Sequence, residues 1–227
     1  MVSGEKKIQV ISFDTDEDRV MFDDEKGNRV PGDIITALLV RLFSGAESAI
    51  IYDLRSSRVV REEIEKHNFR PIESRVGHAF IKPLMRKENA AFGGELSGHY
   101  YFRDFFYCDS GIFAALAVLE LMRTEKKPLY ELVRPLQKYA KTEEINFEVK
   151  EKEKTLDMVV AHFNDEKISY LDGITVLHWD DAIPAVERWW FNLRLSNTEN
   201  LVRLNLEAQT PELLDKKKKL ISELLKN

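Results

Sequence analysis

The chain has 227 residues, 44% hydrophobic and 32% charged, which is the balance of a soluble globular protein with one large or two modest domains. Its net charge of −5 argues against nucleic acid or an anionic membrane as the main partner. The single cysteine, Cys108, fits a reducing compartment, and no apolar run is long enough for a signal peptide or a membrane span. We therefore expect a cytoplasmic protein.

An acidic segment, DTDEDR, follows the first predicted strand. Residues 8–13 form a short apolar run with β-branched residues, which predicts a buried strand. Asp14, Asp16 and Asp18 then alternate, so three hard oxygen donors of the kind that Mg²⁺ prefers can converge. Without a cation these charges would repel one another, and Arg19 could instead face a substrate phosphate. The alternative is an ordinary acidic turn.

Strand and helix patterns then alternate as far as residue 123. The predicted elements are a hairpin over 20–30, a helix over 31–43, a buried strand over 48–54, a helix over 56–67, a helix near 79–87 that Pro83 delays or kinks, a strand, loop and strand over 90–102, and a helix over 111–123. The last helix is apolar almost all round, so we expect it to be buried on most sides. The alternation predicts an α/β domain.

The loop within 90–102 reads GGELSGH. Its glycines free the backbone for positive φ and for close approach to a ligand. Glu95, Ser97 and His99 alternate, so in a locally extended segment they point to the same side. A carboxylate, a hydroxyl and an imidazole together suit a polyol such as a sugar. The alternative is a polar surface turn.

A histidine and a lysine stand one helical turn apart in the segment VGHAFIK. His78 follows a glycine, and Lys82 lies four residues further on. His78 could act as a general acid or base or donate to a phosphate. A structural histidine is the alternative.

Beyond residue 123 the chain becomes more charged, and a second, smaller unit follows. We expect residues 124–156 to form a solvated strand edge or a linker. The later predicted elements are β-hairpin segments over 157–163 and 168–179, strands over 188–195 and 201–208, and an amphipathic helix opened by Thr210 and Pro211.

The turn between the last two predicted strands contains the residues of an anion site. Arg194 ends one strand and Arg203 lies in the next, and Ser196, Asn197 and Thr198 lie between them. Hydroxyls, an amide and backbone N–H groups can form an anion-binding turn, and arginine supplies a bidentate fork for phosphate. A plain hairpin turn is the alternative.

The order of these segments resembles the phosphohexomutases, the family of phosphomannomutases and phosphoglucomutases. The order is DTDEDR, VGHAFIK, GGELSGH and RLSNTE, and the neighbouring HYYFRDFFYCDSGIFAAL is also similar, so that the resemblance covers nearly the whole chain. It implies an isomerase of carbohydrate metabolism that moves a phosphoryl group between C1 and C6 of a hexose through a phosphoserine, with Mg²⁺ as cofactor.

The resemblance also implies roles for individual residues. The implied sets are the metal ligands Asp14, Asp16 and Asp18, the sugar-binding Glu95, Ser97 and His99, and the phosphate-binding Arg194, Ser196, Asn197 and Thr198. Arg19 and His78 match active-site residues of the family. Arg55 falls where many members have a lysine, and because arginine stays charged we expect it to face phosphate, together with Lys82 and Arg203.

The chain resembles only the C-terminal half of the family, because it contains no Ser-His-Asn-Pro loop of the type that carries the reactive serine. We expect residues 1–29 to be a remnant of the second domain with the metal loop. Residues 30–136 would form a third-domain-like, sugar-binding α/β domain with a mixed sheet. Residues 137–227 would form a smaller, phosphate-binding α+β domain with an antiparallel sheet. Thr15 and Glu17 replace glycines of the family's DGDGDR loop, which strains the loop if positive φ is required.

These observations predict a truncated, mutase-derived chain that binds hexose phosphate and Mg²⁺ and is inactive on its own. The alternative is a non-catalytic sugar-phosphate-binding module or fragment that needs a separate N-terminal half. The strand over 8–13 has lost its parent sheet, so it pairs elsewhere, stays loose or drives self-association through its edge. The residues leave open whether mannose or glucose phosphate is preferred.

Overall fold

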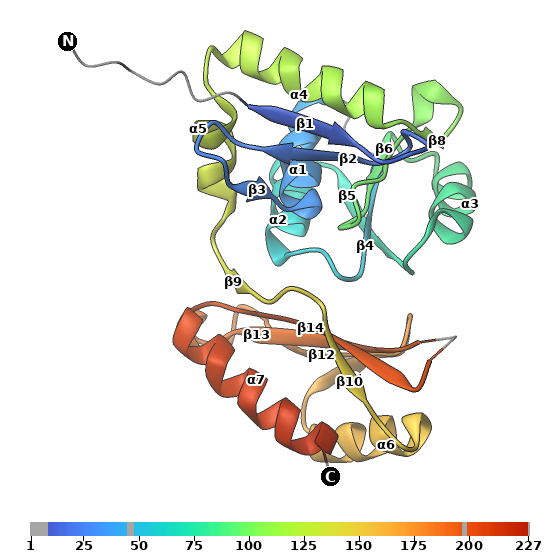
Figure 1. The fold of residues 1–227 in the computed structure, drawn as a ribbon, viewed down its shortest axis with the longest axis vertical. Helices are drawn as coiled ribbons and strands as arrows, with labels where there is room; N and C mark the ends of the chain where they lie inside the picture. The colour runs from blue at the N-terminus through green and yellow to red at the C-terminus, as the bar shows by residue number, and fades with distance from the viewer. Residues whose placement is uncertain (1–8, 45–47, 197–198, 227) are drawn as a thin grey trace, which may run out of the picture. The chain divides into compact units, whose positions relative to one another are not determined.

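A computed structural model describes residues 9–44, 48–196 and 199–226 of the chain (Figure 1). The chain divides into two compact units, Met1–Gln137 and Lys138–Asn227, and each is described by itself. Asn197 and Thr198, two of the expected phosphate ligands, lie outside the described residues. Within the described ranges, no helix is long and apolar enough to cross a membrane.

The first unit begins with a small antiparallel sheet in the order β1-β2-β3. Its strands are β1 (Val10–Phe13), β2 (Val20–Asp23) and β3 (Arg29–Val30). The Asp24 carboxylate closes the β2–β3 turn by accepting from the backbone N–H groups of Lys26 and Asn28, at 2.8 and 2.9 Å. The strand β1 pairs with β2, but its side chains are not buried as expected, because Val10 and Phe13 are 46% and 39% exposed.

A mixed sheet forms the centre of the first unit, in the order β5-β4-β6-β7-β8. Its strands are β4 (Ala49–Asp53), β5 (Arg70–Ser74), β6 (Phe92–Gly94), β7 (Tyr100–Phe102) and β8 (Cys108–Asp109). The fully buried β4 runs parallel to β5 and β6, and the β6–β7 and β7–β8 pairs are antiparallel. A buried central strand with parallel neighbours is typical of α/β proteins, and this sheet confirms the predicted fold class.

Helices surround these strands. They are α1 (Gly32–Leu39), α2 (Arg58–Lys66), α3 (His78–Glu88), α4 (Gly111–Glu125) and α5 (Leu129–Val133), with 3₁₀ turns η1 (Val40–Leu42), η2 (Arg103–Phe105) and η3 (Arg134–Leu136). The Ser57 and Ser110 hydroxyls cap α2 and α4 by accepting a backbone N–H from Val59 and Phe113. Helix α3 contains Pro83 inside its length, so the proline does not delay its start.

Helix α4 is less buried than its sequence predicts. It packs against α1 and β2 on one side, and Figure 1 shows it running alongside the small sheet. Its opposite side exposes Ile112, Phe113, Leu116 and Leu119 by between 42% and 60%. The expectation of a helix buried on most sides was therefore wrong.

The second unit is an antiparallel sheet with two helices on one face (Figure 1). The strand order is β10-β14-β13-β12-β11, and β9 pairs with the end of β14. The elements are β9 (Ala140–Lys141), β10 (Ile145–Glu148), α6 (Lys152–His162), β11 (Lys167–Ser169), β12 (Ile174–His178), η4 (Ala185–Glu187), β13 (Trp189–Leu195), β14 (Leu201–Ala208) and α7 (Pro211–Lys226). Residues 157–163 were expected to be β-structure and lie instead in and just after α6, which is a correction.

The two faces of this sheet differ sharply in polarity. Alternate residues of β13 and β14, among them Phe191, Leu193 and Leu204, are fully buried in a core that also contains Val159 of α6 and Ile221 of α7. The intervening residues point to the other face and are Asn192 and Arg194 on β13, and Arg203, Asn205 and Glu207 on β14. One face therefore holds the second unit together, and the other presents a row of polar side chains.

Candidate functional site

The acidic loop DTDEDR connects β1 to β2. Carboxylate oxygens of Asp14, Asp16 and Asp18 lie within 4.8 Å of one another. Arg19 donates its backbone N–H and its Nε to the Asp14 carboxylate, at 3.1 and 2.5 Å. Glu17 has a φ of 61°, so the loop does adopt the left-handed conformation that strains a residue other than glycine.

Opposing influences set the pKa values of these carboxyl groups. Desolvation raises the pKa of Asp14, but the hydrogen bonds from Arg19 lower it by more, so the pKa of Asp14 is lowered overall. Desolvation raises the pKa of Asp18, as do the charges of Asp16 and Asp14, while His99 opposes the rise. A cluster of hard oxygen donors with like charges so close together fits a divalent cation such as Mg²⁺.

The loop GGELSGH forms the turn of the β6–β7 hairpin. The Glu95 N–H donates to the His99 carbonyl at 2.9 Å, and the Gly98 N–H donates to the Glu95 carbonyl at 3.1 Å. Gly98 has a φ of 93°. The segment is therefore a tight turn and not the locally extended strand on which the shared direction of Glu95, Ser97 and His99 was based.

Glu95 lies under this turn and is only 2% exposed. Its carboxylate accepts the hydroxyl of Tyr101 and the backbone N–H of Gly77, the latter at 3.1 Å. Burial raises the pKa of Glu95, the Tyr101 hydrogen bond lowers it, and the charge of Asp53 raises it, with a net rise. Glu95 thus joins this loop, residues 93–99 and named the sugar loop after its expected role, to Gly77, which precedes α3.

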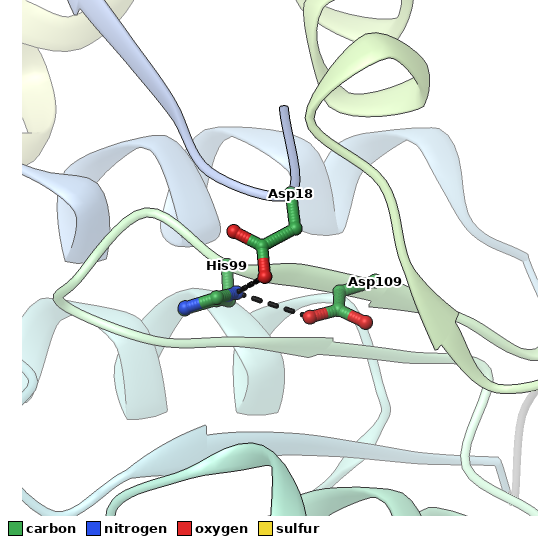
Figure 2. Close-up of side chains that lie close together, drawn as sticks. All are labelled: Asp18, His99 and Asp109. Atoms are coloured by element: carbon green, nitrogen blue, oxygen red, sulfur yellow. Dashed lines mark hydrogen bonds and ion pairs between the residues drawn. The ribbon is translucent and has the colours of Figure 1, made fainter. Parts of the chain in front are cut away.

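The sugar loop and the acidic loop lie against each other. Arg19 and His99 form an isolated antiparallel bridge, and the Val20 N–H donates to the Gly98 carbonyl at 3.1 Å. The ring nitrogen Nδ1 of His99 lies 3.9 Å from an oxygen of Asp18 (Figure 2). Two segments about eighty residues apart in the sequence therefore build one site.

A second carboxylate, that of Asp109, approaches the same ring nitrogen of His99. His99 Nδ1 lies 3.0 Å from Asp109 Oδ2, and Lys82 Nζ lies 2.6 Å from Asp109 Oδ1. In Figure 2, Asp18 and Asp109 approach the same ring nitrogen of His99, and the other ring nitrogen points away from both. Burial favours the uncharged forms of Asp109 and His99, but the hydrogen bond between them favours the charged forms more strongly. The pKa of Asp109 therefore falls well below its usual range, and the pKa of His99 rises.

A buried ion pair contacts the sugar loop through the backbone of Leu96. Asp53, at the end of β4, is fully buried and accepts Arg55 Nη2 and the Leu96 backbone N–H, both at 2.8 Å. Arg55 Nη2 also lies 4.0 Å from Glu95 Oε2. Arg55 is thus in the site but is engaged by carboxylates of the chain itself.

Three residues of this cluster were missed by sequence reasoning: Asp53, Tyr101 and Asp109. A carboxylate at the end of an otherwise apolar strand was the available signal for Asp53. Tyr101 and Asp109 gave no comparable signal, because their role depends on which loops the mixed sheet brings together. His78 begins α3 as an exposed residue, and Lys82 of the same helix reaches Asp109.

The second unit holds the residues of the expected phosphate clamp that lie within the described ranges. Arg194 and Arg203 lie directly opposite each other on β13 and β14. Ser196 is 5% exposed, and its backbone N–H donates to the Leu201 carbonyl at 2.9 Å. The two arginines share a carboxylate, Glu144, which lies 3.5 Å from Arg194 and 3.3 Å from Arg203.

Two sequence models of a single family match the chain. They describe phosphoglucomutase/phosphomannomutase, alpha/beta/alpha domain III, over residues 31–139, and phosphoglucomutase/phosphomannomutase, C-terminal domain, over residues 144–224. A phosphomannomutase of Methanocaldococcus jannaschii is 42% identical over 215 residues, which are 94% of this chain and 46% of that protein. The chain thus spans about half the length of the curated relatives that it matches.

Solved structures share the fold. A phosphoglucomutase/phosphomannomutase family protein from Burkholderia thailandensis has a TM-score of 0.81 and 25% identity, and the match covers 96% of this chain and 46% of that one. An N-acetylphosphoglucosamine mutase from Aspergillus fumigatus, solved in complex with GlcNAc-6P and magnesium, has a TM-score of 0.73 at 14% identity and covers 98% and 53% of the two chains. At that identity the second likeness concerns the fold alone.

Proposed function

We propose, from the premise that this chain belongs to the phosphoglucomutase/phosphomannomutase family and corresponds to its C-terminal half, that it binds a hexose phosphate and supplies the sugar-binding and phosphate-binding parts of a phosphohexomutase. The observation that carries this proposal is the meeting of the acidic loop and the sugar loop at Arg19 and His99. Carboxylates for a cation and polar groups for a sugar thereby lie side by side in the first unit.

The acidic loop is the proposed magnesium site. Asp14, Asp16 and Asp18 would hold Mg²⁺, which as a Lewis acid would neutralise charge on a transferring phosphoryl group. Arg19 donates to the Asp14 carboxylate, which it would share with that ion, and it would direct its remaining guanidinium N–H groups to the phosphate.

Ser97 and His99 each have a polar atom that we assign to the sugar. Within the described residues, the Ser97 hydroxyl is buried and has no hydrogen-bond partner. One ring nitrogen of His99 points away from Asp18 and Asp109 (Figure 2). Glu95 already accepts two hydrogen bonds, and a carboxylate has capacity for about four, so it can still accept a sugar hydroxyl.

Basic and polar side chains of the chain would hold the phosphate groups. Arg194 and Ser196, with Asn197 and Thr198, are the proposed clamp for the phosphate that does not react. His78, Lys82 and Arg55 lie on the elements around the sugar loop and would face the reacting end, and Arg203 lies beside Arg194.

In the complete reaction a phosphoserine would exchange a phosphoryl group with C1 or C6 of a hexose. This chain contains no Ser-His-Asn-Pro segment, so turnover would require that serine from another polypeptide segment. The alternative function is a sugar-phosphate-binding module without turnover. Sugar-phosphate chemistry and a single cysteine are compatible with action in the cytoplasm.

Calorimetric titration with mannose 1-phosphate and glucose 1-phosphate, with and without Mg²⁺, tests this proposal. We expect saturable binding that weakens in Arg194→Ala and loses its Mg²⁺ dependence in Asp16→Asn. Mutase turnover by the chain alone would exclude the binding-module alternative. Absence of binding to both sugar phosphates, in a chain shown to be folded, would overturn the proposed function.

A further inference from the structure

Two arginines face each other across the β13–β14 pair of the second unit. Arg194 and Arg203 are partners in the antiparallel register, so their side chains leave the same face of the sheet side by side. Like charges at directly opposite positions destabilise a strand pair unless an anion lies between them. The strand register therefore calls for an anion between the two guanidinium groups.

The chain supplies that anion itself. Oxygens of Glu144 lie 3.5 Å from Arg194 Nη2 and 3.3 Å from Arg203 Nη1, and Asn205 Nδ2 donates to Glu144 at 3.2 Å. Asp172 Oδ2 lies 3.8 Å from the other terminal nitrogen of Arg194. Two carboxylates therefore balance two guanidinium groups, and the cluster has no net charge with which to attract a further anion.

We propose that Glu144 is an internal competitor for phosphate at Arg194 and Arg203, and that the site therefore selects doubly charged phosphate monoesters over singly charged anions. This inference rests on the proposed function, because it concerns the same phosphate-binding arginine. It adds a specificity-determining residue, Glu144, which lies before β10 and outside the segments that sequence reasoning singled out.

The selectivity follows from the charges exchanged. An anion with one charge that displaces the Glu144 carboxylate only restores the balance that existed before, and it gains no Coulomb energy from the exchange. A phosphate monoester has a second pKa of about 6, so at pH 7.5 it brings two charges and gains an additional attraction. A site without Glu144 would attract both kinds of anion.

The geometry allows the exchange. The Nε atoms of Arg194 and Arg203 are buried and have no hydrogen-bond partner among the described residues, so the chain does not satisfy either guanidinium fully. The exchange concerns the terminal nitrogens that now contact Glu144. Both arginines are anchored on long paired strands. Glu144 instead lies in the irregular segment between β9 and β10, and its side chain is 25% exposed, so it can turn towards water when a ligand takes its place.

The test compares two ligands of the same shape and different charge. Glucose 6-phosphate and glucose 6-sulfate are titrated at pH 7.5 into the whole chain, as wild type, Glu144→Gln and the control Glu143→Gln. Glutamine keeps the size and a hydrogen-bond acceptor, and Glu143 is the exposed neighbour with the same charge. We expect Glu144→Gln to bind glucose 6-sulfate about tenfold more tightly than the wild type does, because the sulfate no longer has to displace a charged carboxylate. Its affinity for glucose 6-phosphate should rise by a smaller factor. Glu143→Gln should match the wild type.

Other outcomes would overturn the inference. Weaker binding of both ligands by Glu144→Gln would mean that Glu144 holds the arginines in place and does not compete. An unchanged preference for phosphate over sulfate, or no binding by any variant, would also contradict it. Arg194→Ala separates the two hypotheses. If this variant binds glucose 6-phosphate as tightly as the wild type does, the proposed phosphate clamp is wrong. If it loses binding while Glu144→Gln keeps the wild-type ratio of phosphate to sulfate affinity, only the proposed competition is wrong.

Discussion

Gly98 of the sugar loop lies against Val20, the first residue of β2 after the acidic loop. Its φ is 93°, and a Cβ added to it would lie 2.8 Å from the Val20 carbonyl oxygen. The same residue accepts the Val20 N–H that holds the loops together. Its identity therefore controls both the turn and the approach of the acidic loop.

Gly98→Ala should destabilise the protein and separate the loops. We expect a loss of roughly 3 kcal/mol, because left-handed strain and a backbone clash each cost about 1–2 kcal/mol. The control is Gly27→Ala, where φ is 80° and an added Cβ meets no described atom within 4 Å, so that only the strain remains. Urea unfolding measures both changes. Equal losses for the two variants would mean that the Gly98–Val20 approach is not tight.

Three buried tyrosines predict the behaviour of the protein in alkali. Burial raises the pKa of Tyr52 to about 12 and also raises the pKa values of Tyr100 and Tyr101. In the unfolded chain a tyrosine ionises near pH 10, so the stabilisation is complete below that pH and is lost as the pH rises through 12. For Tyr52 the two-unit difference corresponds to about 3 kcal/mol.

Absorbance at 295 nm, followed from pH 8 to 13, measures this effect. We expect some of the seven tyrosines to titrate only together with loss of circular dichroism. Tyr52→Phe should shift the alkaline midpoint upwards, since phenylalanine cannot ionise. Smooth titration of all tyrosines with the fold intact would contradict the prediction.

At the scale of elements, helix α4 has one buried and one exposed side. Leu121 is 5% exposed and Leu116 is 60% exposed, although both are leucines of the same helix. Leu121→Ala should cost about 2–5 kcal/mol through the cavity it leaves, and Leu116→Ala about 0.5 kcal/mol. Thermal or urea unfolding measures both. A large loss at Leu116 would show that the exposed side is covered in solution, for example by a second copy of the chain.

The elements themselves were largely predictable from the sequence, and their burial was not. Hydrophobic periodicity identifies most helices and strands before residue 124, among them α2 and α4. It misses α5 and β10, which lie in the segment 124–156 that was expected to be a solvated strand edge or a linker. The errors have a common cause. The apolar residues of β1 and of α4 predict burial. Whether a face is buried depends on which other element packs against it, and the local sequence pattern does not specify that element. In α6, the β-branched Val159 and Val160 favour a strand locally, but packing against the sheet of the second unit stabilises a helix.

The candidate site was predictable as separate segments but not as contacts. Alternating carboxylates in DTDEDR and the glycines of GGELSGH carried a chemical signal in the sequence. That Asp18 and Asp109 would approach one nitrogen of His99 depends on a mixed sheet that places β8 beside β7 (Figure 2). The role of Glu144 could not be predicted from the sequence either, because it depends on the strand register that pairs Arg194 with Arg203.

At the scale of the whole molecule, each unit has its own core. In the second unit the buried residues of the sheet, α6 and α7 form one hydrophobic cluster without any contribution from residues before 138. A chain of that length with a continuous core and paired strands can fold alone. Residues 138–227 expressed alone should therefore unfold cooperatively.

Tryptophan fluorescence makes this prediction specific, because all three tryptophans, Trp179, Trp189 and Trp190, belong to the second unit and are buried. In the whole chain, Leu204→Ala removes a fully buried side chain of this core and should lower the stability reported by fluorescence by about 2–5 kcal/mol. Ile51→Ala, at an equally buried position of β4, should leave the fluorescence transition in place and shift only the remaining circular dichroism signal. If Ile51→Ala moves the fluorescence transition as far as Leu204→Ala does, the two units fold as one cooperative body, and the isolated residues 138–227 would then lack the stability that this argument assigns to them.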